Sequence, residues 1–140
     1  VWESFRDGIV MCASVLSTIM AIGLLGMLIA LYTPVFDIIG YIFLPFAAAV
    51  QLPEATVAAQ ALATSIAEMS LPTVFVTGAS MATRYVVAVT CISEIIFFSA
   101  VVPCIMSTSI PIKMRDLIII WVERVILSIL LAGVVALIFL

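Results

Sequence analysis

One acidic residue stands near the middle of a long apolar segment. Residues 85–109 read YVVAVTCISEIIFFSAVVPCIMSTS, and the acid is Glu94. Inside a membrane, an ionisable group is stable only where it meets water, a partner or a proton. Thr90 lies one helical turn earlier and so shares a helix face with Glu94, and Phe97 and Phe98 follow. A carboxylate, a hydroxyl and aromatic rings together predict a site for a polar organic ligand or a cation.

A structural role for Glu94 is the alternative. Either Arg84 or Arg124 could form a buried ion pair with it and lock the helices together. Breaking such a pair is strongly destabilising, because it leaves a buried charge without its counter-charge. The binding hypothesis predicts a hydrated cavity around Glu94, whereas the structural hypothesis predicts an arginine in a dry interface.

A second acid, Glu68, precedes a break in the helical pattern at residues 70–73, Ser-Leu-Pro-Thr. The helix dipole disfavours an acid at the C-terminal end of a helix, so we expect Glu68 to be solvated, protonated, or bound to a cation or a basic group. A second hydroxyl-rich break covers residues 107–109. Broken helices supply substrate and ion sites in many transporters, and ordinary loops at the membrane surface are the alternative. The candidate binding residues are Glu94, Thr90, Glu68, Ser70, Thr73, Ser107, Thr108 and Ser109.

Composition narrows the function classes. The chain has no histidine, the commonest metal ligand and proton shuttle. Its three cysteines lie far apart in apolar runs, where a buried small hydrophobe is the simple interpretation. Sequence motifs of hydrolases and phosphate-binding loops are absent, and the net charge of −3 does not fit nucleic-acid binding, which requires a basic surface. We therefore expect no enzyme activity, no cofactor, no metal and no nucleic-acid partner.

The same composition predicts a protein of the lipid bilayer. Of the 140 residues, 66% are hydrophobic and 9% charged, whereas about a quarter of the residues in an average soluble domain are charged. We predict one all-α unit over residues 1–140, a polytopic integral membrane protein with broken or re-entrant helical segments. Pro45 interrupts the second segment. The predicted spans are about 9–31, 85–106 and 117–140, and the short or re-entrant segments are about 34–50 and 54–83.

Small residues recur at four-residue spacing on two of these segments. They are Ala13, Ser17 and Ala21 on the first segment, and Ala55, Ala59, Ala63 and Ala67 on the third. Such stripes let helix backbones approach closely in a membrane, so we expect a homodimer or pairing with a second similar unit. Three further acids, Asp37, Glu54 and Asp116, are interpreted as helix-end residues at the membrane surface.

Residues 92–138, ISEIIFFSAVVPCIMSTSIPIKMRDLIIIWVERVILSILLAGVVALI, resemble the C-terminal part of the nucleoside-recognition, or Gate, domain family. The matching features are the acid followed by aromatic residues, the Ser/Thr break before Ile110 and Pro111, and a basic-acidic step before a last span with Trp121 and Arg124. Within that family, the chain is most similar to the YjiH-like membrane proteins.

The resemblance implies a location and a class of function. Gate domains occur in concentrative nucleoside transporters, in ferrous-iron transport proteins and in spore-maturation membrane proteins. The resemblance therefore implies a transport or gating domain in a bacterial inner (cytoplasmic) membrane, acting on a small polar solute such as a nucleoside, with cation or proton coupling. It assigns a site-lining role to Glu94 and to residues 107–109. A non-transporting membrane assembly or signalling subunit is the alternative.

Overall fold

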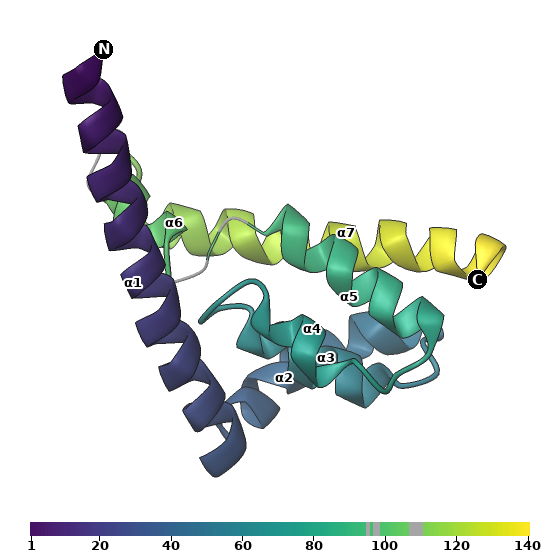
Figure 1. Ribbon diagram of the computed structural model, residues 1–140. Helices are drawn as coiled ribbons and strands as arrows, with labels where there is room; N and C mark the ends of the chain where they lie inside the picture. Colours follow the sequence, from purple (N-terminus) through teal and green to yellow (C-terminus); the bar gives the residue numbers. More distant parts are fainter. Residues whose placement is uncertain (95, 97–98, 107–110) are drawn as a thin grey trace.

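The structure is a computed structural model, and it describes residues 1–94, 96, 99–106 and 111–140. The described part is all-α (Figure 1), as predicted from the hydropathy pattern. The elements follow in the order α1 (Trp2–Tyr32), α2 (Val35–Ala49), α3 (Ala55–Thr64), α4 (Leu71–Phe75), α5 (Met81–Ser93), α6 (Val101–Met106) and α7 (Met114–Phe139).

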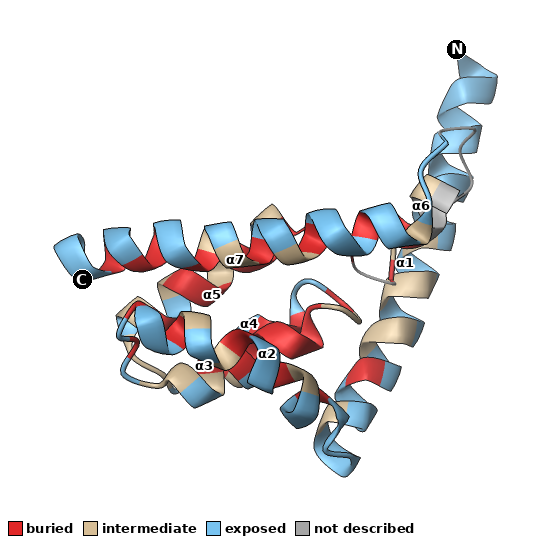
Figure 2. Cartoon of the chain, turned by 180° about the vertical axis from the view of Figure 1, so that it is seen from behind, coloured by how far each residue is buried: buried red, intermediate tan, exposed pale blue. Residues whose placement is uncertain are grey.

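The core lies between α2, α3, α5 and α7. α2 packs along α3 and α5 packs along α7, with buried residues on the sides that face each other (Figure 2). Two glycines allow the closest approaches between these elements. A Cβ added at Gly40 of α2 would lie 3.1 Å from the Cα of Gln60 on α3. A Cβ added at Gly133 of α7 would lie 2.4 Å from the Cβ of Val50, just after α2.

The alanine stripe of the third predicted segment packs inside the chain. Ala59 and Ala63 are buried, and the most extensive contacts of α3 are with α2. Our expectation that this stripe requires a partner chain therefore loses its basis. The stripe on α1 differs, because Ala13, Ser17 and Ala21 are all exposed.

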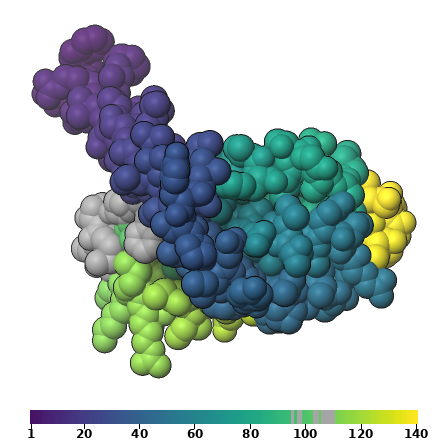
Figure 3. Space-filling model, turned by 90° about the horizontal axis from the view of Figure 1, so that it is seen from below, coloured from purple at the N-terminus to yellow at the C-terminus, as the bar shows by residue number. Residues whose placement is uncertain are grey.

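α1 is an arm that touches the rest of the molecule near its C-terminal end. Gly26 is the buried residue of this helix. A Cβ added there would lie 2.8 Å from the Cβ of Ala67 and 3.3 Å from the side chain of Leu71, so α1 meets the chain where α3 gives way to α4. The N-terminal half of α1 projects away from the other helices (Figure 3).

α1 and α7 are long and apolar enough to cross a membrane, since the hydrocarbon core takes about 20 helical residues. The predicted segments 9–31 and 117–140 lie almost entirely within these two helices. Most of the apolar side chains of α1 are exposed, and α7 buries one face against α5. α2, α3 and α5 are apolar but shorter.

The second segment is more regular than we predicted. α2 runs without interruption through Pro45 to Ala49, although we expected a kinked or re-entrant segment there. Proline removes one backbone hydrogen bond from a helix. Packing of an apolar face supplies most of the stability of helices in proteins, and the contact of α2 with α3 accounts for its continuation past the proline.

The break predicted at residues 70–73 lies earlier in the chain. α3 ends at Thr64, and residues 65–70 form turns before α4 begins. The hydroxyls of Thr64 and Ser65 donate to backbone carbonyls three residues before them. Side chains that bond the local backbone in this way compete with the helix, which accounts for the early end of α3.

The predicted span 85–106 is not a single helix. α5 ends at Ser93, the next residue has an extended backbone (φ −67°, ψ 148°), and α6 begins only at Val101. The hydroxyl of Ser93 donates to the carbonyl of Thr90 at 2.8 Å, again a local bond that competes with the helix. Glu94 is the residue that follows α5, so it lies at a helix break and not within a continuous helix.

Candidate functional site

The carboxylate of Glu94 is buried without a completed hydrogen bond in the described part of the chain. Its residue is 6% exposed, and neither carboxylate oxygen has a hydrogen-bond partner in the described part of the chain. The polar groups that face it are the Ser65 hydroxyl and the Trp121 indole. The Ser65 hydroxyl donates to the carbonyl of Leu62 instead. Two elements far apart in sequence, the turn after α3 and the first half of α7, therefore enclose this carboxylate.

Trp121 brings a second unsatisfied group to the same place. Its Nε1 is buried and has no acceptor among the described residues. The ring is held by Phe43 of α2, with ring centroids 5.6 Å apart and planes at 86°, an edge-to-face arrangement that aromatic pairs favour. Packing against Phe43 thus keeps the indole ring in position, with its N–H facing Glu94.

The chain after Glu94 folds back onto the turn after α3. The backbone N–H of Ser99 donates to the carbonyl of Ala67 at 3.2 Å. Ser99 is fully buried, and its hydroxyl also has no partner within the described ranges. Ser99 therefore lies beside the non-helical residues 65–70, and non-helical backbone at membrane depth survives only against protein or water.

Glu68 lies in the first of these segments and is satisfied locally. It is 7% exposed, and its Oε2 accepts from the Ser70 N–H at 2.7 Å and from the Ser70 hydroxyl. α1 passes directly over it, since a Cβ added at Gly23 would lie 3.7 Å from the Glu68 Cγ. We expected solvent, a proton, a cation or a basic group at Glu68; the structure shows hydrogen bonds from Ser70.

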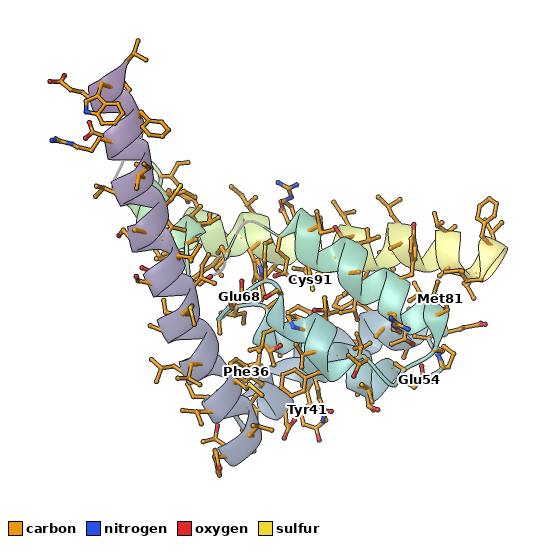
Figure 4. The ribbon with its side chains drawn as sticks, viewed as in Figure 1. Phe36, Tyr41, Glu54, Glu68, Met81 and Cys91 are labelled. Carbon is orange, nitrogen blue, oxygen red and sulfur yellow. The ribbon has the colours of Figure 1, made fainter. Side chains whose placement is uncertain are left out.

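Glu68 and Glu94 both lie near the thiol of Cys91. Both carboxylates lie within electrostatic reach of Cys91 on α5, and Figure 4 shows Glu68 and Cys91 in the region between α1 and α7. Cys91 is buried and free. The structure thus brings together the two acids that the sequence singled out, from segments separated by α4 and α5.

The remaining candidate residues have other positions. Thr90 is fully buried, but its hydroxyl donates to the carbonyl of Val86 at 2.8 Å. Thr73 is exposed, donates to the carbonyl of Ser70 at 2.6 Å, and lines a separate cavity of about 280 Å³ beside Arg84. Ser107, Thr108 and Ser109 lie outside the described residues.

The ion-pair lock is not seen in the part of the chain that the structure describes. Arg84 and Arg124 are both exposed, and the ion pair found among the described residues joins Arg6 to Asp7. The structural hypothesis for Glu94 required an ion pair with Arg84 or Arg124, and the described residues show no such pair.

Sequence reasoning missed the neighbours of Glu94. The sequence alone does not predict that Ser65 or Trp121 faces Glu94, or that Ser99 is buried. One signal was available: Thr64 and Ser65 are adjacent hydroxyl residues that close an alanine-rich helix, and such residues favour helix ends. No local pattern connects Trp121 with Glu94, because their proximity arises from the tertiary fold.

Glu54 is the counterpart of Glu94 at the other end of the molecule. Its Oε2 accepts from the hydroxyls of Thr83 and Ser80, both at 2.7 Å. These bonds, chiefly that from Thr83 and then that from Ser80, lower the pKa of Glu54. The carboxylate thereby joins the start of α3 to the start of α5, a structural role that fits its interpretation as a helix-end acid.

Comparison with known proteins adds little about function. No family model matches the chain, and no solved structure matches it. The chain is 30% identical over 127 residues to an uncharacterized protein of Alkalihalophilus pseudofirmus. The match covers 90% of this chain, which spans only 27% of the length of that protein. The function must therefore be argued from the site itself.

Proposed function

We propose that this chain is a membrane-embedded transport or gating unit for a small polar solute, with a nucleoside as the first candidate. In this proposal the Glu94 carboxylate binds the solute or a coupled cation or proton. The observation that carries the proposal is the burial of both Glu94 oxygens without a hydrogen-bond partner in the described part. Burying a polar group without compensation costs on the order of 1–3 kcal/mol, and more for a charge, so a ligand that satisfies the carboxylate would explain why it is kept.

The groups around Glu94 favour an organic solute over a bare cation. Glu94 offers acceptors and Trp121 offers a donor, and both are unsatisfied in the described chain. A monatomic cation would satisfy the carboxylate and leave the indole N–H without a partner. A solute that carries both hydroxyl or amino donors and a carbonyl or ring-nitrogen acceptor would satisfy both groups, and nucleosides have this combination.

Membrane embedding is supported by α1 and α7, whose outward side chains are apolar over most of their length. A bacterial inner membrane follows from the Gate-domain resemblance and is part of the proposal. In Figures 1 and 2, α1 crosses α7 instead of running alongside it, whereas spanning helices tilt by about 20° on average. Embedding both helices as spans therefore requires one of them to change its orientation.

A non-transporting assembly or signalling subunit is the second candidate, and the exposed small-residue stripe on α1 favours it. Ala13, Ser17 and Ala21 lie on an arm that no other described helix covers along this length. Such a stripe suits close packing against another helix, supplied by a second copy or by another part of a longer protein. Native mass spectrometry in nanodiscs tests the second copy, and Ala21→Leu places a bulky side chain on the stripe to block close packing. Dimers that persist in Ala21→Leu would argue against this contact.

Uptake of radiolabelled uridine into proteoliposomes tests the transport proposal, with and without imposed Na⁺ or proton gradients. Glu94→Gln preserves the shape of the side chain and removes its charge. We expect the variant to fold and uptake to fall at least about tenfold, the loss expected for one hydrogen bond to a charged group. Glu54→Gln is the matched control and should transport normally, because its partners lie at the other end of α5.

Two results would contradict the proposal. The first is wild-type protein that moves neither uridine nor any of a panel of small polar solutes under either gradient. The second is a Glu94→Gln variant that is destabilised and then restored by Arg84→Gln or Arg124→Gln, because this pattern identifies a structural ion pair.

A further inference from the structure

A separate cavity of about 320 Å³ lies where α1, α2, α3 and α4 meet. Phe36 and Asp37 of α2, Gln60 and Thr64 of α3, and Phe75 of α4 contribute to its lining. Figure 4 places Phe36 at this end of the molecule, away from Glu54 at the start of α3. Its volume falls in the range of about 300–1,000 Å³ that small-molecule sites occupy.

The polar groups of this cavity are mainly hydrogen-bond acceptors. The side chain of Asp37 has neither an ion pair nor a hydrogen bond with any other residue in the described ranges. The Thr64 hydroxyl donates its proton to the carbonyl of Ala61 at 2.7 Å, so its oxygen can only accept towards the cavity. Gln60 adds an amide, which can both accept and donate. Asp37 and Thr64 can only accept, so a ligand that presents donors fits these two groups, and a positive charge would complement Asp37.

The apolar part of the lining decides which kind of cation fits. Phe36 and Phe75 place two aromatic rings beside the acceptors. Calcium and magnesium prefer shells of several oxygens, which two phenylalanine rings would obstruct. Organic ammonium groups favour the combination, because aromatic rings attract them through the cation–π interaction while a carboxylate balances their charge.

We infer that this cavity binds an organic ammonium group, supplied by a small amine in solution or by an amine lipid headgroup. A smaller cavity of about 70 Å³ shares Asp37 and Gln60 with the first and adds Tyr41 and Leu44, which gives room for an apolar substituent next to the ammonium group. Thr64 lines this cavity, whereas the next residue, Ser65, faces Glu94. Neither Ser65 nor Trp121, the two groups that face Glu94, lines the cavity, and the inference does not rest on the proposed transport role.

Isothermal titration of the purified whole protein with choline and with ethanolamine tests the soluble source. Asp37→Asn should weaken binding at least about tenfold, as expected for the loss of a charged partner, and Asp37→Glu should retain most of it. Phe75→Leu should weaken the binding of choline more than that of ethanolamine, because binding of a quaternary ammonium group depends more on the aromatic ring. Glu3→Gln also removes an acid from the first turn of a helix but lies outside the cavity, and it should bind as the wild type does.

Native mass spectrometry of protein released from nanodiscs tests the lipid source. If the wild type and Glu3→Gln retain phosphatidylethanolamine in preference to phosphatidylglycerol while Asp37→Asn does not, that result would identify the ligand of this cavity as an amine lipid headgroup. Saturable binding of choline or ethanolamine would identify it as a free amine. The inference is overturned if folded wild-type protein binds neither source, or if Asp37→Asn binds as tightly as the wild type. Uridine uptake that persists in Asp37→Asn would leave the transport proposal standing in either case.

Discussion

Glu54 and Glu94 lie at opposite ends of helix α5, and their carboxylates differ in hydrogen bonding. Glu54, at the start of α3, accepts hydrogen bonds from Thr83 and Ser80. Glu94, directly after α5, is more deeply buried, and its carboxylate completes no hydrogen bond with the described residues. Both residues lie next to α5, at its two ends, so one helix carries a satisfied carboxylate and an unsatisfied one.

In our proposal, this difference separates a structural role for Glu54 from a binding role for Glu94. Buried polar groups in folded proteins are nearly always hydrogen-bonded, and Glu54 follows this rule by joining two helices. Glu94 breaks the rule in a region where Trp121 and Ser99 also lack partners within the described chain. Three side chains in the described part of the chain are thus unsatisfied, and two of them, Glu94 and Trp121, face each other; in our proposal a ligand or water completes their hydrogen bonds.

The largest effect is expected for Glu94→Leu. Replacing a buried, unpartnered carboxylate by an apolar side chain of similar size should raise the free energy of unfolding by about 1–3 kcal/mol, and it should abolish transport. Thermal unfolding in detergent, measured with uridine uptake on the same preparation, gives both values. A Glu94→Leu variant that unfolds at a lower temperature than the wild type would mean that this carboxylate is satisfied in the folded protein, and the contrast with Glu54 would disappear.

Thr83→Val tests the hydrogen bond that satisfies Glu54. Thr83 is fully buried and donates to Glu54 at 2.7 Å. Valine keeps the shape of the side chain and removes the hydroxyl, so we expect a loss of about 1 kcal/mol in the free energy of unfolding. Transport should not change. Thr90→Val is the control for a buried threonine on the same helix whose hydroxyl bonds only its own backbone, and a loss as large as that of Thr83→Val would show that the bond to Glu54 adds nothing.

The stability of the protein should depend on pH through the ionisation of Glu54. Its pKa is lowered from the ordinary value of 4.5 by the hydroxyls of Thr83 and Ser80. A carboxyl whose pKa is lowered on folding stabilises the protein above its ordinary pKa, and this contribution is lost as the pH falls through the lower folded value. The melting temperature of the wild type should therefore exceed that of Glu54→Gln near neutral pH, and the gap should close below pH 4.5. A gap that is the same at acidic and neutral pH would show that charge is not involved.

The smallest effect is expected for Ser99→Ala. The hydroxyl of Ser99 is fully buried without a partner in the described chain, so removing it should leave stability unchanged or raise it by roughly a few tenths of a kcal/mol. The backbone bond from Ser99 to Ala67 does not depend on the side chain. Chemical denaturation with a common slope for both proteins measures the difference. A clear loss of stability would reveal a partner for this hydroxyl.

Hydropathy alone predicted the all-α class and the two long apolar helices, because a run of apolar residues of sufficient length needs no knowledge of its neighbours. The same reasoning placed an acid of interest at Glu94 and another at Glu68. It failed at helix ends in the middle of the chain, where it missed the early end of α3 and the break after Ser93. Hydroxyl side chains that bond the backbone decide these ends, and propensity represents such bonds weakly.

What the sequence by itself determined is therefore local: which segments are apolar, where prolines and hydroxyls interrupt them, and which acids lie among them. Only the tertiary structure decided whether each carboxylate has hydrogen-bond donors. Ser80 and Thr83 reach Glu54 from 26 and 29 residues away, whereas no comparable group in the described chain completes a bond to Glu94. The physical reason is that satisfying a buried carboxylate requires donors placed by packing between helices, and the spacing of residues along one helix carries no information about those donors.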